Sequence, residues 1–97
     1  MTTLMVLYGP PSDPAAFRDH YETTHLPLAE ALPGATAMRY SLDVAAAEGD
    51  SPYAAVFEAD FADGAALDAA LASPEGQAAQ ADVPAFATGG VTILVLG

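Results

Sequence analysis

The sequence predicts an α+β fold in which four strands form one antiparallel sheet and the helices cover one of its faces. The chain begins and ends with short apolar runs rich in β-forming residues, and two alternating segments lie between them. One helix signature precedes the two alternating segments and another follows them. With 97 residues, the chain has room for one such domain, so a single domain over residues 1–97 is expected.

The first strand is predicted over residues 2–8 and stops at the turn Gly9-Pro10-Pro11. Apolar side chains alternate onto both of its faces, and the last strand, residues 91–96, has the same pattern. Strands that are apolar on both faces are usually covered on both sides.

The first helix is predicted to begin after Asp13, which can cap free N–H groups, with Pro14 at the first helical position. Because Pro27 cannot donate to the helical hydrogen-bond ladder, a break or kink is expected near His25, followed by a short turn over residues 29–32. One stripe of side chains recurs at spacings of four, three and four residues: Phe17, Tyr21, Thr24 and Leu28.

Residues 36–43 and 53–61 alternate in polarity and are joined by a polar loop that contains glycine. They are predicted to form an antiparallel pair. Arg39 and Glu58 each lie on the face opposite the main apolar row of their strand, so we expect an ion pair between them.

A second helix is predicted to begin after Asp63, and Ser73 marks a fresh cap, so a further helical piece is expected to about Ala81. Residues 83–90 are then predicted to be a loop. The complete order of strand, helix, strand, strand, helix and strand is the ferredoxin-like βαββαβ pattern.

The helices of this fold cover one face of the sheet, which leaves apolar side chains on the other face without a partner. A second copy of the same sheet is the simplest cover, so the chain is predicted to form a homodimer through its sheet faces.

The chain is strongly acidic: thirteen acids oppose two arginines, which gives a net charge of −11. Phosphate backbones and anionic membranes are repelled by such a surface, so we expect neither nucleic acid nor membrane as a partner. The absence of cysteine excludes disulfides, thiolate nucleophiles and cysteine metal ligands. The first residues lack a basic segment and a long apolar run, so no signal peptide is expected and a cytoplasmic location is predicted.

His25 is the best candidate for an acid or base, since an imidazole exchanges protons near neutral pH. The alternative is that His25 caps carbonyls freed by Pro27. His20 lies five residues before His25, about 140° away on an ideal helix, so a shared metal ion is rejected and His20 is expected at the surface. No metal site is expected.

The segment Phe17–Leu28 resembles the signature of the EthD family, with an aromatic residue, Tyr21, His25 and Pro27-Leu28 in register. The resemblance implies a dimeric α+β barrel and a pocket between sheet and helices into which His25 projects. EthD proteins are associated with the degradation of ether fuels and with small-molecule catabolism. We expect the following side chains to line the pocket: Tyr8, Phe17, Tyr21, Leu28 and Tyr40.

The expected function is therefore that of an EthD-like protein that takes a small hydrophobic or aromatic molecule. It would be a cofactor-free isomerase, cyclase or catabolic enzyme with His25 as general acid/base. A non-catalytic carrier of a hydrophobic metabolite, or a haem-handling relative with His25 as axial ligand, are the alternatives.

Overall fold

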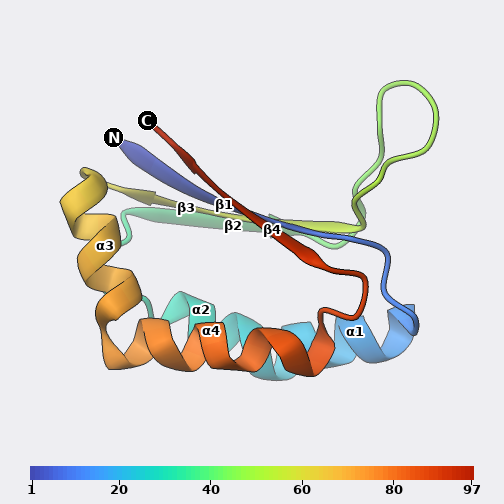
Figure 1. Cartoon of the computed structure of the whole chain (residues 1–97), viewed down its shortest axis with the longest axis horizontal. Helices are drawn as coiled ribbons and strands as arrows, with labels where there is room; N and C mark the ends of the chain where they lie inside the picture. The colour runs from blue at the N-terminus through green and yellow to red at the C-terminus, as the bar shows by residue number, and fades with distance from the viewer.

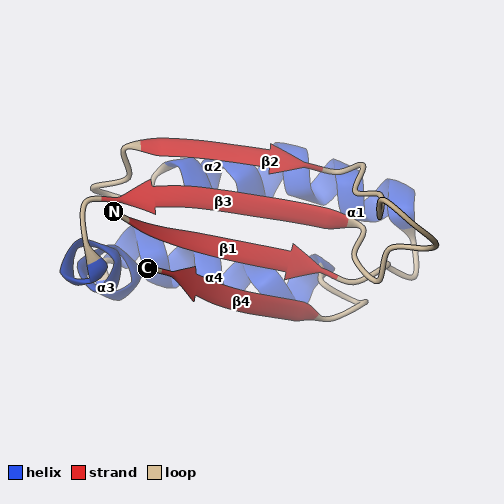
Figure 2. Cartoon of the chain, turned by 90° about the horizontal axis from the view of Figure 1, so that it is seen from above, coloured by secondary structure: helices blue, strands red, loops and turns tan.

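Four strands form one antiparallel sheet in the order β2-β3-β1-β4, in a computed structural model that describes the whole chain, residues 1–97 (Figure 2). The fold class is the predicted one. The alternating middle segments are shorter than expected, because only residues hydrogen-bonded to a neighbouring strand belong to the sheet. The strand bounds are β1 Thr2–Tyr8, β2 Ala37–Ser41, β3 Ala55–Phe61 and β4 Val91–Leu96.

All helices lie against one face of the sheet, which Figure 1 shows from the side. The first helical segment runs beneath β2 and β3, and α4 runs beneath β1 and β4 (Figure 2). The shorter α3 stands at one end and joins the sheet to α4 (Figure 1). The bounds are α1 Pro14–His20, the π-helix η1 Tyr21–His25, α2 Leu26–Glu30, α3 Gly64–Ala72 and α4 Pro74–Phe86.

Of the break or kink predicted near His25, the break is wrong, because α1, η1 and α2 form one continuous helical segment; the helix instead changes to π-helical bonding over η1, which ends at His25. Asp13 caps its start as expected, with its carboxylate accepting from the Ala16 N–H at 3.1 Å. The Leu26 N–H donates to the carbonyl five residues earlier, that of Tyr21. Pro27 has no N–H to donate, and the i→i+5 bonding just before it lets the helix absorb the missing bond and continue.

The second helical region begins as predicted at two caps, Asp63 for α3 and Ser73 for α4. However, α4 continues past the expected end near Ala81 and through Pro84 to Phe86, where a loop was predicted. Phe86 is buried, and tertiary packing of its ring stabilises the final turn against the cost of the proline.

The core between the layers is built around aromatic rings. Tyr8 from β1 meets Phe17, Tyr21 and Phe86 at ring-centroid distances of 5.6, 5.8 and 5.5 Å. Edge-to-face and tilted arrangements of this kind add about 0.5–1.5 kcal/mol per pair beyond the burial of area. These contacts hold α1, η1 and α4 against the centre of the sheet.

Gly76 allows the close approach of α4 to the last turn of α3. A Cβ at this position would lie 2.2 Å from the carbonyl oxygen of Ala70 and 2.7 Å from that of Leu71. Gly76→Ala is therefore expected to destabilise the protein by about 2 kcal/mol, because two backbone segments must separate. Urea unfolding measures the change. The matched control is Gly64→Ala, whose Cβ meets nothing within 4 Å; equal destabilisation by the two variants would contradict the prediction.

Candidate functional site

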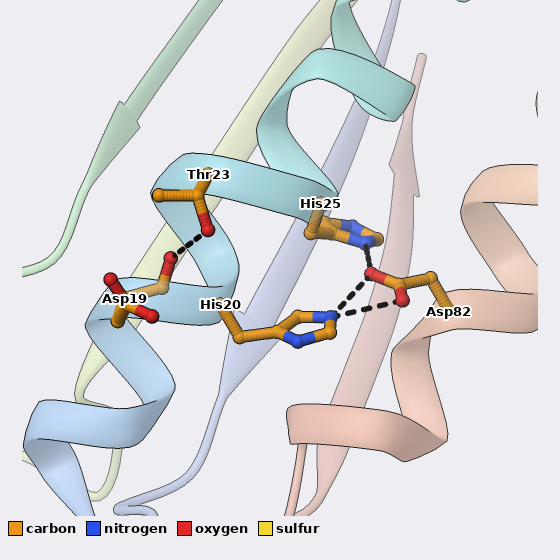
Figure 3. A network of polar contacts seen from close by, with 5 residues as sticks. All are labelled: Asp19, His20, Thr23, His25 and Asp82. Carbon is orange, nitrogen blue, oxygen red and sulfur yellow. Dashed lines mark hydrogen bonds and ion pairs between the residues drawn. The ribbon is translucent and has the colours of Figure 1, made fainter.

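Two histidines of the first helical segment converge on one carboxylate of α4 (Figure 3). The Nδ1 atom of His25 lies 3.0 Å from Oδ2 of Asp82. The Nε2 atom of His20 lies 2.9 Å from Oδ1 and 3.0 Å from Oδ2 of the same residue. Asp82 thus links both imidazoles to the helix that packs opposite them.

The π-helix explains why the two histidines meet. An ideal α-helix places residues five apart on different sides, about 140° from each other. The i→i+5 bonding of η1 instead brings His20 and His25 to the same side. The surface position expected for His20 holds only in part: its side chain is 30% exposed, but it is hydrogen-bonded to Asp82.

The contacts with Asp82 determine which nitrogen of His25 is free. A carboxylate only accepts hydrogen bonds, so Nδ1 of His25 carries the hydrogen and donates it. In the neutral ring the lone pair then resides on Nε2. This nitrogen has no hydrogen-bond partner in the chain. It is also not fully buried, because the only side-chain polar atom that is both fully buried and without a partner is the Tyr21 hydroxyl.

Burial keeps His25 in its neutral form. The residue is 5% exposed, and this burial lowers the pKa of His25 below its ordinary value of 6.5, against the opposing effect of the hydrogen bond and charge of Asp82. The charge of His20 lowers that pKa further. At neutral pH the imidazole is therefore a free base whose protonated form Asp82 stabilises when it arises.

A cavity of about 90 Å³ lies between the sheet and the helices beside His25. It opens at the β4 edge, where the lining residue Ile93 is 55% exposed. Most of its wall is apolar. The lining residues are Leu4, Val6, Tyr8, His25, Ala29, Leu32, Phe57, Leu71, Gly76, Ala79, Gln80, Val83 and Ile93.

Of the residues expected to line a pocket, the structure brings Tyr8 and His25 together in this cavity. Phe17 lines a separate hollow beside His20, and Tyr40 lines a third hollow near α2. Tyr21 is buried in the aromatic core, and Leu28 is half-buried on α2 and does not line the cavity.

Asp82 is the residue of this candidate site that the sequence did not reveal. It falls at the boundary between the predicted helix and the predicted loop, where an acid is normally solvated. One signal was present: Asp82 is the only acid of α4 beyond its first turn, in a helix that is otherwise rich in alanine. Its pairing with histidines 57 and 62 residues earlier in the chain leaves no local trace.

The site is arranged for hydrogen bonding. No group of three or more His, Cys, Asp or Glu side chains has the geometry to hold a metal ion. The cavity of about 90 Å³ is also too small for a porphyrin unless the helices move away from the sheet, since a cavity of about 150 Å³ holds only a benzene-sized ligand. None of the helices has the length and hydrophobicity needed to cross a membrane.

Comparison with known proteins yields one family and close structural relatives. The EthD domain model matches residues 9–90. An uncharacterised 11.0 kDa protein from the thcB-thcC intergenic region of Rhodococcus erythropolis is 42% identical over 99 residues, covering 97% of this chain and 91% of that protein.

Two solved structures are similar over almost their whole length. An EthD family protein of Bacillus halodurans has a TM-score of 0.92 and 32% identity, covering 100% of this chain and 97% of that one. A dimeric ferredoxin-like protein of unknown function from Jannaschia has a TM-score of 0.74 and 27% identity, covering 99% of this chain and 97% of that one.

Proposed function

The chain belongs to the EthD family, as the Phe17–Leu28 motif predicted, and on that basis we propose that it catalyses proton transfer on a small hydrophobic molecule. His25 acts as the general base through Nε2 and returns the proton as general acid. Asp82 holds the imidazole in the required tautomer and stabilises the imidazolium.

One observation carries this proposal: a buried histidine, fixed by a carboxylate through Nδ1, borders an apolar cavity with its other nitrogen unpartnered. A structural histidine of the core normally has both polar atoms satisfied. A base with a lowered pKa beside a cavity is instead typical of a catalytic site.

The cavity indicates the size and character of the substrate. Its volume of about 90 Å³ accommodates only the reacting part of a molecule, and the opening at β4 allows the remainder to project outward. Ten of the thirteen lining residues are hydrophobic, so an apolar molecule is favoured over a charged one.

The direct test is the exchange of carbon-bound protons for deuterium in D₂O, followed by NMR with unsaturated lactones, cyclic ketones and quinols. We expect exchange whose rate falls as the pH decreases, because protonation removes the lone pair of His25. Since burial lowers the pKa of His25, the midpoint of this loss lies below pH 6.5. A midpoint clearly above 6.5 would assign the step to another group, and tight binding without exchange would favour a carrier.

We propose that the protein works as a homodimer through the sheet face that the helices leave open. Directly opposite strand pairs place Met5 and Leu94 together on this face, and Leu7 and Val56 beside them. The Jannaschia relative, which has the same fold, is described as dimeric. An apolar sheet face of this kind is normally covered by another layer.

The other part of the same face is polar. Arg39 is paired with Glu58, as predicted, and its Nη1 also lies 3.3 Å from Oδ2 of Asp60. The hydroxyl of Thr3 donates to Asp60 at 2.7 Å. Because these charges are paired within the chain, they oppose burial against a second sheet less than free charges would.

A further inference from the structure

Tyr8 presents a second polar group to the cavity that holds His25. It is the only residue with a hydroxyl in the cavity wall, and it is 2% exposed. The hydroxyl forms no hydrogen bond within the chain and is not fully buried, and the cavity beside His25 is the one that Tyr8 lines. Three aromatic rings around Tyr8 restrict its side chain.

No other donor on the wall is free. The only further polar side chain is that of Gln80, whose Nε2 donates to the carbonyls of Leu71 and Gly76 at 3.0 and 2.9 Å. The cavity therefore combines an unpartnered basic nitrogen, Nε2 of His25, with one free donor, the hydroxyl of Tyr8.

We propose that Tyr8 donates a hydrogen bond to a substrate oxygen, and that the substrate is a small, largely apolar carbonyl compound with an acidic C–H bond next to the carbonyl group. This inference rests on the proposed role of His25 and adds the class of substrate to it. A base and a hydrogen-bond donor in one apolar cavity are the two groups that enolisation requires.

The step is balanced without a further reactant. Nε2 of His25 takes the proton, the electron pair of the C–H bond forms the carbon–carbon double bond, and the carbonyl oxygen takes the negative charge. The hydroxyl of Tyr8 stabilises that oxygen, and His25 then returns the proton to carbon. Burial, and after it the charge of Asp82, raises the pKa of Tyr8 above its ordinary value of 10.0, so the phenol remains a donor at neutral pH.

The test compares the binding of phenol and toluene to the full-length protein by NMR titration. Phenol is an aromatic enol of nearly the same shape as toluene. Its oxygen is small enough to enter the cavity and accept from Tyr8 while the ring extends toward the opening at β4. We expect the wild type to bind phenol more tightly than toluene. Tyr8→Phe should weaken phenol binding about 3- to 10-fold, the effect of one hydrogen bond, and leave toluene binding unchanged.

Tyr53→Phe is the control, because Tyr53 lies in the loop before β3 and outside the cavity. The inference is overturned if Tyr8→Phe leaves phenol binding unchanged, if it weakens phenol and toluene equally, or if the wild type shows no preference for phenol. The proposed function is tested separately by deuterium exchange that depends on His25. Exchange can therefore persist when the assignment of Tyr8 fails.

Discussion

His25→Asn is expected to reduce the rate of deuterium exchange by about 10²- to 10⁴-fold, the usual contribution of a positioned general base. An asparagine amide can still donate to Asp82 from the place of Nδ1, but it offers no basic nitrogen to the cavity. The loss should therefore come from the missing base, with the helix contact retained. Exchange rates measured across the pH range should also lose the inflection that His25 causes.

Asp82→Asn tests the contribution of the carboxylate that is hydrogen-bonded to His25. The substitution removes the negative charge that stabilises the imidazolium. It also lets an amide N–H face Nδ1, which favours the tautomer with its hydrogen on Nε2. We therefore expect the rate of deuterium exchange to fall by roughly 10²-fold or more. Thr24→Ala is the control, since Thr24 is exposed and adjacent to His25 in the chain. Circular dichroism and melting curves establish that the variants are folded. Unchanged exchange in folded His25→Asn would refute the proposed function.

Leu94→Glu is expected to convert the protein from a dimer into a monomer. Leu94 lies opposite Met5 in the open sheet face and is 43% exposed in the single chain. By two-fold symmetry the substitution would place two unpaired carboxylates in the interface of an already acidic protein, so dimerisation should weaken at least about 100-fold. Sedimentation equilibrium should give a mass near 9.8 kDa for the variant and twice that mass for the wild type.

The neighbouring residue supplies the control. Val95 is 59% exposed but points to the opposite face of β4, since it pairs with Leu4 on the helix side. Val95→Glu should remain dimeric. A monomeric Val95→Glu variant together with a dimeric Leu94→Glu variant would place the interface on the wrong face, and a monomeric wild type would refute the dimer.

The sequence by itself determined the elements whose signals are local. Asp13, Asp63 and Ser73 each cap the helix that follows them, because a cap depends on a side chain and N–H groups two or three residues away. The strands were also predictable, since alternation and β-branched residues are properties of short segments. The order of these elements then restricted the topology to the ferredoxin-like fold.

Local rules failed at the two prolines within helical segments. Pro27 predicts a break or kink, and the segment 83–90 that contains Pro84 is predicted to be a loop, yet the helix continues through both prolines. At Pro84, packing of Phe86 into the aromatic core outweighs the lost hydrogen bond. At Pro27, the π-helix η1 accommodates the missing hydrogen bond. The outcome at Pro84 depends on contacts with other elements, which helix propensity does not contain.

The candidate site is where tertiary structure decided most. The motif in the sequence identified His25, and the five-residue spacing predicted that His20 and His25 lie on different sides of the helix. The change to i→i+5 bonding brought them to one side, and the packing of α4 against η1 placed Asp82 between them. Helix register and the docking of a distant helix together produce this arrangement. Neither can be read from residue spacing, because both depend on the free energy of the whole packed core.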